Sequence, residues 1–317
     1  MLGIAKKLTQ AGVLGLNRRN AEYTLWHNSR HLYPLVDDKL TTKTLAQQAG
    51  MAVPPLYGII EIQHQVRELA TLLSPYEDFV IKPAQGSGGD GIVVIIGRHH
   101  NRYRKANGQL ITQEDLNHHV SNALSGLYSL GGHPDKVLIE CLVRFDPIFE
   151  AISYQGVPDI RIIVFLGVPV MAMVRLPTRM SEGKANLHQG AIGAGINIRT
   201  GKTLSGVWQN DIVTVHPDTE HSITGVQVPE WEKLLNLAAR SYELTGLGYQ
   251  GVDLVLDKDK GPLILELNAR PGLNIQIANR AGLLTRLHLV EQHAPSLKTV
   301  EDRITFSKQH FGTIHET

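Results

Sequence analysis

The sequence predicts an α+β fold whose sheets are mostly antiparallel, with an α/β arrangement as the alternative. Runs of β-branched residues alternate in blocks with amphipathic helical patterns. Several of these runs are separated only by a short turn, which is how antiparallel neighbours are joined. At 317 residues, with 42% apolar residues, the chain can form one large domain or two ordinary ones.

The elements are expected in the following order. Residues 37–49 have the apolar period of a helix that Gly50 ends, and a strand is expected near Val53. Residues 61–74 have the same helical period. The rest of the pattern predicts a helix over 112–125 that starts at a Thr112–Asp115 capping box, strands over 137–143, 148–154, 160–166 and 168–176, a glycine-rich loop over 183–195, a helix over 230–246, a hairpin over 250–268 and a helical end.

Composition excludes several classes of protein. The formal net charge is +1, so no overall field indicates a nucleic-acid partner or an anionic membrane. The single cysteine, Cys141, excludes an internal disulfide and favours a reducing compartment. No apolar run is long enough to span a bilayer and the first residues make a poor signal peptide, so we expect a cytoplasmic protein. The 15 histidines include adjacent pairs that point apart, and no zinc site is expected among them.

A glycine-rich stretch, IKPAQGSGGDGIVVII at 81–96, has the G-x-G-x-x-G spacing of a dinucleotide-binding loop. That reading requires a strand before the loop and a helix after it. Here a strand enters, but five apolar residues, Ile92–Ile96, leave and predict a second strand. A glycine hairpin with a lysine on its first strand, here Lys82, is typical of folds that cover nucleotide phosphates. A flexible hairpin with an incidental lysine remains the alternative.

The hairpin GVDLVLDKDKGPLILELNARPG, residues 251–272, brings acidic side chains together. With its turn centred between residues 259 and 260, Asp253 is expected to face Glu266, just as Val255 faces Ile264 and Asp257 faces Pro262. Asn268 shares the face of Glu266 because side chains alternate along a strand. Such oxygen ligands suit Mg²⁺. The alternative is an edge hairpin whose exposed acids pair with Arg270.

In this order the motifs resemble the ATP-grasp superfamily, and more closely its α-L-glutamate ligase-like branch, which is related to the ribosomal-protein glutamate ligase RimK. The resemblance runs from about residue 17 to 290 and rests on NRRNAEY (17–23), PLVDDKLTTK (34–43), IKPAQGSGGDGI (81–92), LIECLV (138–143), DIRIIVF (159–165), KANLHQGAIGAG (184–195), GVDLV (251–255) and ELNARPG (266–272).

The resemblance implies a fold of two α+β subdomains that clasp ATP. It implies a division into an N-terminal segment (1–36), an ATP-grasp domain (37–290, with subdomains 37–140 and 141–290) and a tail (291–317). Only 38 residues precede Lys39, where many relatives place a full domain that helps to form the second-substrate site. Substrate identity is therefore less constrained than ATP binding.

The resemblance also implies roles for individual residues. ATP is contacted by Lys39, Lys82, the loop residues Gly86, Ser87, Gly88, Gly89 and Gly91, and the adenine- and ribose-side positions Glu140, Cys141, Leu142, Val143 and Asp146. Two Mg²⁺ ions, for which Mn²⁺ can substitute, are held by Asp253, Glu266 and Asn268. The catalytic candidates are Arg161, Arg175, Asn186 and Arg270, the last in place of an arginine that some relatives have where this chain has Gly251.

The implied activity is ATP- and Mg²⁺-dependent ligation of a small-molecule carboxylate to an amine, such as an amino acid or peptide, through an acyl phosphate. Glutamate or a similar amino acid is the implied donor. A phosphotransferase on the same scaffold and a non-catalytic nucleotide-binding subunit of a partner complex remain as alternatives.

Overall fold

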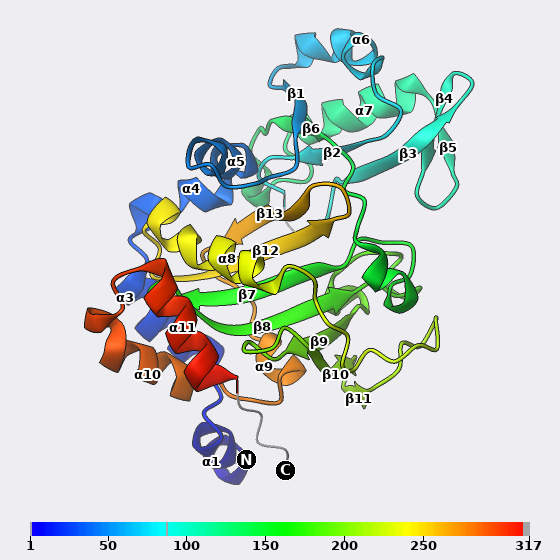
Figure 1. The fold of residues 1–317 in the computed structure, drawn as a ribbon. Helices are drawn as coiled ribbons and strands as arrows, with labels where there is room; N and C mark the ends of the chain where they lie inside the picture. The colour runs from blue at the N-terminus through cyan, green and yellow to red at the C-terminus, as the bar shows by residue number, and fades with distance from the viewer. Residues whose placement is uncertain (1, 87, 313–317) are drawn as a thin grey trace. The chain divides into compact units, whose positions relative to one another are not determined.

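A computed structural model of the chain describes residues 2–86 and 88–312. The chain forms two compact units (Figure 1). The larger unit comprises Met1–Asp37, Leu45–Ala52 and Phe145–Thr317, and the smaller unit comprises Asp38–Thr44 and Val53–Arg144. Each unit contains one sheet, and the strand ladders of both sheets are antiparallel. The predicted α+β class is therefore confirmed.

The smaller unit is a six-stranded sheet covered on one face by helices. Its strand order is β1-β6-β2-β3-β4-β5, with β1 (Leu56–Ile60), β2 (Phe79–Pro83), β3 (Val93–His99), β4 (Arg102–Lys105), β5 (Leu110–Ile111) and β6 (Val137–Glu140). Apolar side chains of η3 (Gln63–Glu68), α6 (Leu69–Leu73) and α7 (Gln113–Leu124) pack on the face that carries Phe79, Ile81 and Ile95. The opposite face of β2 carries Lys82.

The larger unit is built on a seven-stranded sheet. Its order is β11-β10-β9-β8-β7-β12-β13, with β7 (Asp159–Phe165), β8 (Val168–Leu176), β9 (Ile192–Ile196), β10 (Thr203–Trp208), β11 (Asp211–Val213), β12 (Tyr249–Asp257) and β13 (Gly261–Asn268). The helices that pack on it are α8 (Trp231–Thr245), α9 (Ile275–Ala278), α10 (Leu284–His293) and α11 (Val300–Phe311). The short η4 (Leu130–Gly132) belongs to the smaller unit, and η5 (Pro147–Ile152), η6 (Leu187–Gln189) and η7 (Ala294–Ser296) belong to the larger.

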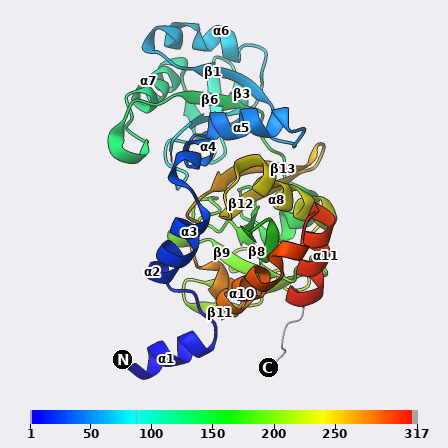
Figure 2. The same cartoon turned by 90° about the vertical axis from the view of Figure 1, so that its left-hand side faces the viewer.

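Residues 2–48 are mostly helical. They form α1 (Leu2–Gln10), α2 (Leu16–Arg18), the π-helix η1 (Arg19–Thr24), α3 (Leu25–His27), η2 (Arg30–Leu32), α4 (Pro34–Asp37) and α5 (Lys39–Gln48). Figure 2 shows α1, α2 and α3 following one another along one side of the larger unit. In the described part of the chain, no helix has both the length and the apolar character that a bilayer crossing requires.

Two predicted elements differ in type. Residues 148–154 do not form a strand, because Asp146 accepts a hydrogen bond from the backbone of Ile148 (2.9 Å) and Pro147 starts a 3₁₀ turn. The helix expected over 61–74 is a 3₁₀ segment followed by a short α-helix. By contrast, the capping box of α7 is confirmed, with Thr112 and Asp115 bonding each other's backbone N–H groups.

Several predicted bounds also shift. The strand expected near Val53 begins at Leu56, and the strand expected over 137–143 ends at Glu140. The glycine-rich stretch 183–195 contains most of β9. After the glycine hairpin, the basic residues 98–105 end β3 and form β4.

The hairpin of β12 and β13 has the predicted pairing at one position and a shifted pairing at two. Asp253 faces Glu266 as expected. Nearer the turn, however, Val255 faces Leu263 and Asp257 faces Gly261, one residue away from the expected partners. A β-bulge between Asp253 and Leu254 adds one residue to one strand of the hairpin. Beyond the bulge, at Asp253, the pairing therefore agrees with the predicted register again.

Candidate functional site

The glycine loop joins β2 to β3, so the strand–loop–strand reading is confirmed. Gly88, Gly89 and Gly91 have positive φ angles of 68°, 86° and 74°. A Cβ atom on Gly91 would lie 2.6 Å from the ring of Tyr128, whereas no atom would approach one on Gly88 or Gly89. There is thus space beside the chain at Gly88 and Gly89, on the side where a Cβ atom would stand. Ser87 lies outside the described residues.

Side chains from other elements hold this loop in place. The Lys39 ammonium donates a hydrogen bond to the carbonyl of Gly86, and the Lys39 backbone N–H donates to Ala84 (3.0 Å). At the far end, His119 Nε2 lies 2.8 Å from the Gly91 carbonyl, which requires the Nε2–H tautomer. Lys39 was predicted to contact the ATP phosphates, and the glycine loop was predicted to cover them. In the structure, Lys39 bonds this loop.

On β6, next to the strand that enters the loop, Glu140 pairs with two lysines. Lys82 Nζ lies 2.7 Å from one carboxylate oxygen of Glu140, and Lys43 Nζ lies 2.9 Å from the other. The three side chains are only 4–8% exposed. Glu140 was expected near adenine, together with the backbone of 141–143. In the structure its carboxylate forms ion pairs with Lys43 and Lys82.

The charges of this cluster do not cancel. Two ammonium groups share one carboxylate, so one positive charge is left in a buried place, which is costly unless an anion compensates it. Burial lowers the pKa of Lys43, although Glu140 opposes the shift. Burial also raises the pKa of Glu140, but the charges of Lys82 and Lys43 outweigh it and leave the pKa below its ordinary value. The cluster fits a phosphate chain.

Lys43 was missed by the sequence reasoning. A signal existed, because Lys43 follows Lys39 by four residues and both lie on one side of α5. Its significance depends on β6 bringing Glu140 beside it, which no local pattern reveals.

The candidates for the adenine and ribose side, Cys141 and Asp146, form hydrogen bonds with nearby backbone groups. The Cys141 backbone N–H donates to the carbonyl of Pro55 (2.9 Å), and the Cys141 thiol contacts the Leu142 carbonyl (3.4 Å). Asp146 caps η5, as described above. Their predicted contacts with ATP, like that of Val143, stay predictions.

In the larger unit, two arginines and two aspartates form a buried cluster. Arg161 donates to both carboxylate oxygens of Asp253, from Nε at 2.7 Å and from Nη2. Arg175 donates to Asp253 at 2.8 Å and makes two further hydrogen bonds to Asp159. The four side chains are 5–13% exposed, and their charges balance.

Strand register explains this cluster. Arg161 is the partner of Asp253 across β7 and β12, and Asp159 is the partner of Arg175 across β7 and β8. Burial raises the pKa of Asp253, but the two arginines reverse that effect and lower it. Asp159, which sequence reasoning did not single out, stands two residues before Arg161 and so on the same face of β7.

Glu266 and Asn268 lie two residues apart on β13, an edge strand, and are partly exposed. Glu266 forms no ion pair within the described residues.

The other two catalytic candidates interact elsewhere. Arg270 pairs with Asp37 (3.8 Å) and lies over the Tyr33 ring. It does not pair with Asp253, so the structure does not have the salt bridge of the alternative reading. Asn186 caps η6 by accepting a bond from His188 (3.0 Å).

The oxygen donors on β12 and β13 fit a magnesium ion unequally. The carboxylate of Glu266 and the amide oxygen of Asn268 are available on one face, apart from a 3.3 Å contact of the amide with the Arg270 N–H. Asp253 faces Glu266, but three guanidinium contacts occupy most of its lone pairs. Within residues 2–86 and 88–312, no cluster of three or more His, Cys, Asp or Glu side chains is placed to hold a metal. A site here therefore depends on the Asn268 oxygen.

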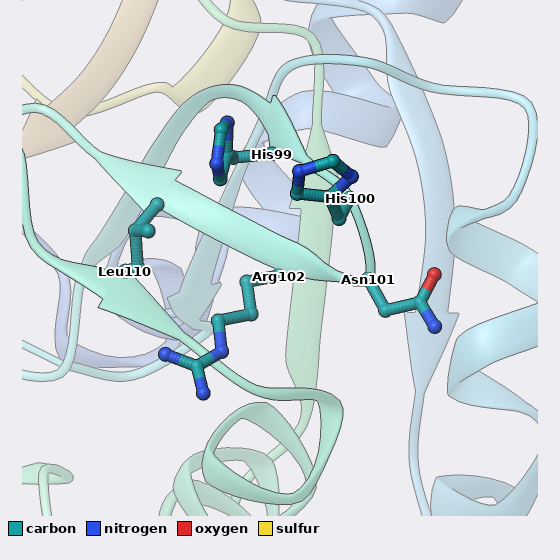
Figure 3. Close-up of a pocket in the computed structure, with 5 residues that line it drawn as sticks. All are labelled: His99, His100, Asn101, Arg102 and Leu110. Carbon is teal, nitrogen blue, oxygen red and sulfur yellow. The ribbon is translucent and has the colours of Figure 1, made fainter.

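A pocket opens on the β3–β4 hairpin, lined by His99, His100, Asn101, Arg102 and Leu110 (Figure 3). The pairing of His99 with Arg102 places both on the sheet face that carries Lys82. The pocket adds one cation, Arg102, to that face and contains none of the predicted site residues.

The comparison with protein families agrees with this geometry. Residues 18–292 match the family described as "Sugar-transfer associated ATP-grasp". The chain belongs to this ATP-grasp family. The resemblance to the ATP-grasp superfamily is therefore confirmed, whereas the assignment to the glutamate-ligase branch is not part of this finding.

Several solved structures are similar to this ATP-grasp chain at low identity. The ligase PsnB complexed with minimal precursor is 15% identical over 85% of this chain and 63% of that chain (TM-score 0.44). The D-cycloserine synthetase DcsG is 18% identical over 85% and 73% (TM-score 0.46). PsnB complexed with a phosphomimetic precursor variant, Mg and ADP is 13% identical over 85% and 62% (TM-score 0.45).

At these TM-scores the likeness establishes nothing about substrates. This ATP-grasp chain also spans less than two thirds of the length of the PsnB chain. No curated protein matches it.

Proposed function

We propose that this protein is an ATP- and Mg²⁺-dependent carboxylate–amine ligase. The observation that carries the proposal is the buried positive charge left by Lys43, Lys82 and Glu140, on and next to the strand that leads into the glycine loop. A buried excess charge of this kind favours a polyanionic ligand, and membership of an ATP-grasp family makes ATP the ligand.

In this proposal the smaller unit binds the nucleotide. Lys82 and Lys43 contact the phosphates, with Glu140 setting the position of both ammonium groups. The phosphate chain lies along the glycine loop, where no Cβ stands in the way at Gly88 and Gly89. Lys39, which bonds the loop at the Gly86 carbonyl, is the third lysine proposed to contact the phosphates.

The reaction proceeds in two displacements. A carboxylate oxygen of the acid substrate attacks the γ-phosphorus of ATP; the bond to the β-phosphate oxygen breaks, and ADP leaves. The nitrogen of the amine then attacks the acyl carbon, inorganic phosphate leaves, and the nitrogen loses a proton. The protein contributes orientation and positive charge: Lys43 and Lys82 supply the uncompensated charge, and Arg161 and Arg175 are held in place as hydrogen-bond donors.

Glu266 and Asn268 are the proposed Mg²⁺ ligands, with Asp253 as the third. A bound Mg²⁺ supplies charge neutralisation at the phosphate oxygens. Asp253 also orients both arginines, so we propose that it serves two functions in the site. Two ions, and Mn²⁺ as a substitute, are part of the same proposal.

The finer assignment follows the resemblance to glutamate ligases. We propose an amino acid such as glutamate as one substrate, an amino acid or peptide as the other, and a cytoplasmic reaction. The same proposal assigns nucleotide binding to residues 37–140 and metal binding to 141–290. Arg270 and Asn186 are proposed on the substrate side.

One incubation separates this proposal from its alternatives. The protein is given ATP, Mg²⁺ and pooled amino acids, and the products are identified by mass spectrometry. A ligase releases ADP and phosphate in equal amounts together with an amide. ADP with a phosphorylated amino acid or alcohol would identify a phosphotransferase instead. Nucleotide binding without ADP release from any acid and amine would support a non-catalytic subunit.

A further inference from the structure

The glycine loop that joins β2 to β3 is anchored at its start on the segment that follows α7. The Asp135 carboxylate, 5% exposed, accepts hydrogen bonds from the backbone N–H of Gln85 (2.9 Å) and from the hydroxyl of Ser129 (2.7 Å). Gly86 and Ser129 also form an isolated antiparallel bridge. The first residues of the loop are therefore fixed through their backbone.

At the end of the loop, the contact comes from the side chain of His119 on α7. Its Nε2–H donates a hydrogen bond to the Gly91 carbonyl (2.8 Å). The Tyr128 ring stacks on the imidazole, with 5.2 Å between the ring centroids, and the Tyr128 hydroxyl lies 3.4 Å from Nδ1. Burial lowers the pKa of His119, although the bond to Gly91 opposes the shift. The neutral imidazole can thus donate to the loop and accept from Tyr128.

His119 is not what packs its own helix into the smaller unit. Leu116 and Val120 are the side chains that α7 places in the core on either side of it. The first turn of the helix is closed by the Thr112–Asp115 capping box. The hydrogen bond of His119 leads instead to the end of the glycine loop.

We infer that His119 is a positioning residue of the nucleotide site, which fixes the end of the glycine loop so that the loop is ordered before the phosphates bind. Gly88 and Gly89 lie between the two anchored ends, and glycine loses more conformational freedom on ordering than any other residue. A loop that is already held at both ends loses less of this freedom when the ligand arrives, which strengthens binding. The inference rests on the proposed function for its ligand, ATP.

Titration with a fluorescent ATP analogue tests this role in wild type and three variants. His119→Leu keeps an apolar side chain beside Tyr128 but removes the donor, so it should weaken ATP binding about tenfold. His119→Gln can donate to the Gly91 carbonyl from its amide and should lose less than about threefold. His118→Leu removes an exposed imidazole from the preceding position and should bind ATP like wild type. Thermal unfolding shows which variants are folded.

Three results would overturn the role of His119. The first is equal ATP affinity in His119→Leu and His118→Leu. The second is an equal loss in His119→Leu and His119→Gln, because the hydrogen bond would then not matter. The third is a His119→Leu protein that does not fold, because the residue would then support the fold rather than the loop.

Hydrogen exchange without nucleotide separates this role from the proposed function. The backbone amides of residues 88–91 should exchange at least about fivefold faster in His119→Leu than in wild type, while those of β2 stay unchanged. Equal exchange of the loop amides in both proteins would contradict the anchoring by His119. Faster exchange in the variant, together with a wild type that binds no ATP, would contradict the proposed function and leave the anchoring intact.

Discussion

Arg161 and Asp253 are direct partners across β7 and β12, and the guanidinium of Arg161 donates hydrogen bonds to both oxygens of the Asp253 carboxylate. Arg175 reaches the same carboxylate from β8 through its pairing with Asp159. Because the strands fix these positions, the arginines are oriented before any substrate binds. The charges of the cluster balance, so what the strands fix is the orientation of the two guanidinium groups.

Arg161→Lys is expected to lower turnover about ten- to a hundredfold while the chain stays folded. Lysine keeps the charge but cannot donate two parallel bonds to one carboxylate. Steady-state ADP release measures the effect. Arg199→Lys, at an exposed arginine, is the matched control. Equal turnover in the two variants would mean that the paired geometry has no catalytic role.

Lys43 and Lys82 are expected to contribute separately to nucleotide binding. Replacing Lys82 with Ala should weaken ATP binding by about 1.5–3 kcal/mol, roughly ten- to a hundredfold. Lys43→Met should also weaken it at least several-fold, and the fold should survive because Lys82 still neutralises Glu140.

Titration with a fluorescent ATP analogue measures both losses. Lys136→Met, which removes a half-exposed lysine of the same unit, is the control. If Lys43→Met bound ATP as tightly as this control, the buried excess charge would have no part in binding.

Glu140 is expected to make stability depend on acid pH. Its pKa is lower in the folded than in the unfolded chain, so its ionised form stabilises the fold above the unfolded pKa of about 4.3. This contribution is lost as the pH falls below that value. Urea unfolding gives the free energy of unfolding of wild type and of Glu140→Gln from pH 7 to pH 3.5. The difference between the two proteins at each pH isolates the effect of Glu140, because the contributions of the other titratable groups cancel in it. A stability difference that stays constant over this range would be inconsistent with the ion pairs.

Glu266→Gln is expected to preserve the fold and to lower turnover on the order of a hundredfold, with a higher Mg²⁺ requirement. The double change with Asp253→Asn should cost far less than the sum of the single changes, since both residues act on the same charge. ADP release as a function of Mg²⁺ concentration measures this. A Glu266→Gln protein with the wild-type Mg²⁺ titration would remove the metal assignment.

Much of the site was predictable because its parts are local. The glycine hairpin was visible from the apolar run after Gly91, and the Asp253–Glu266 pairing from counting outward from the turn. Period two along DIRIIVF also puts Asp159 and Arg161 on one face.

The rest depended on contacts that sequence patterns do not carry. The bulge beside Leu254 shifts the pairings near the turn, and nothing in its neighbourhood marks it. Lys43 became significant only when β6 brought Glu140 beside α5. The 3₁₀ turn over 147–152 did have a signal, Asp146 followed by Pro147, but the apolar residues after it favoured a strand.

The central claim, amide formation through an acyl phosphate, is tested most directly by following an oxygen atom. The acid substrate is labelled with ¹⁸O in its carboxylate, and the inorganic phosphate released during product formation is analysed by mass spectrometry. The proposed route transfers one carboxylate oxygen, so the phosphate should carry a single ¹⁸O per turnover. Unlabelled phosphate accompanying net amide formation would contradict the acyl-phosphate route.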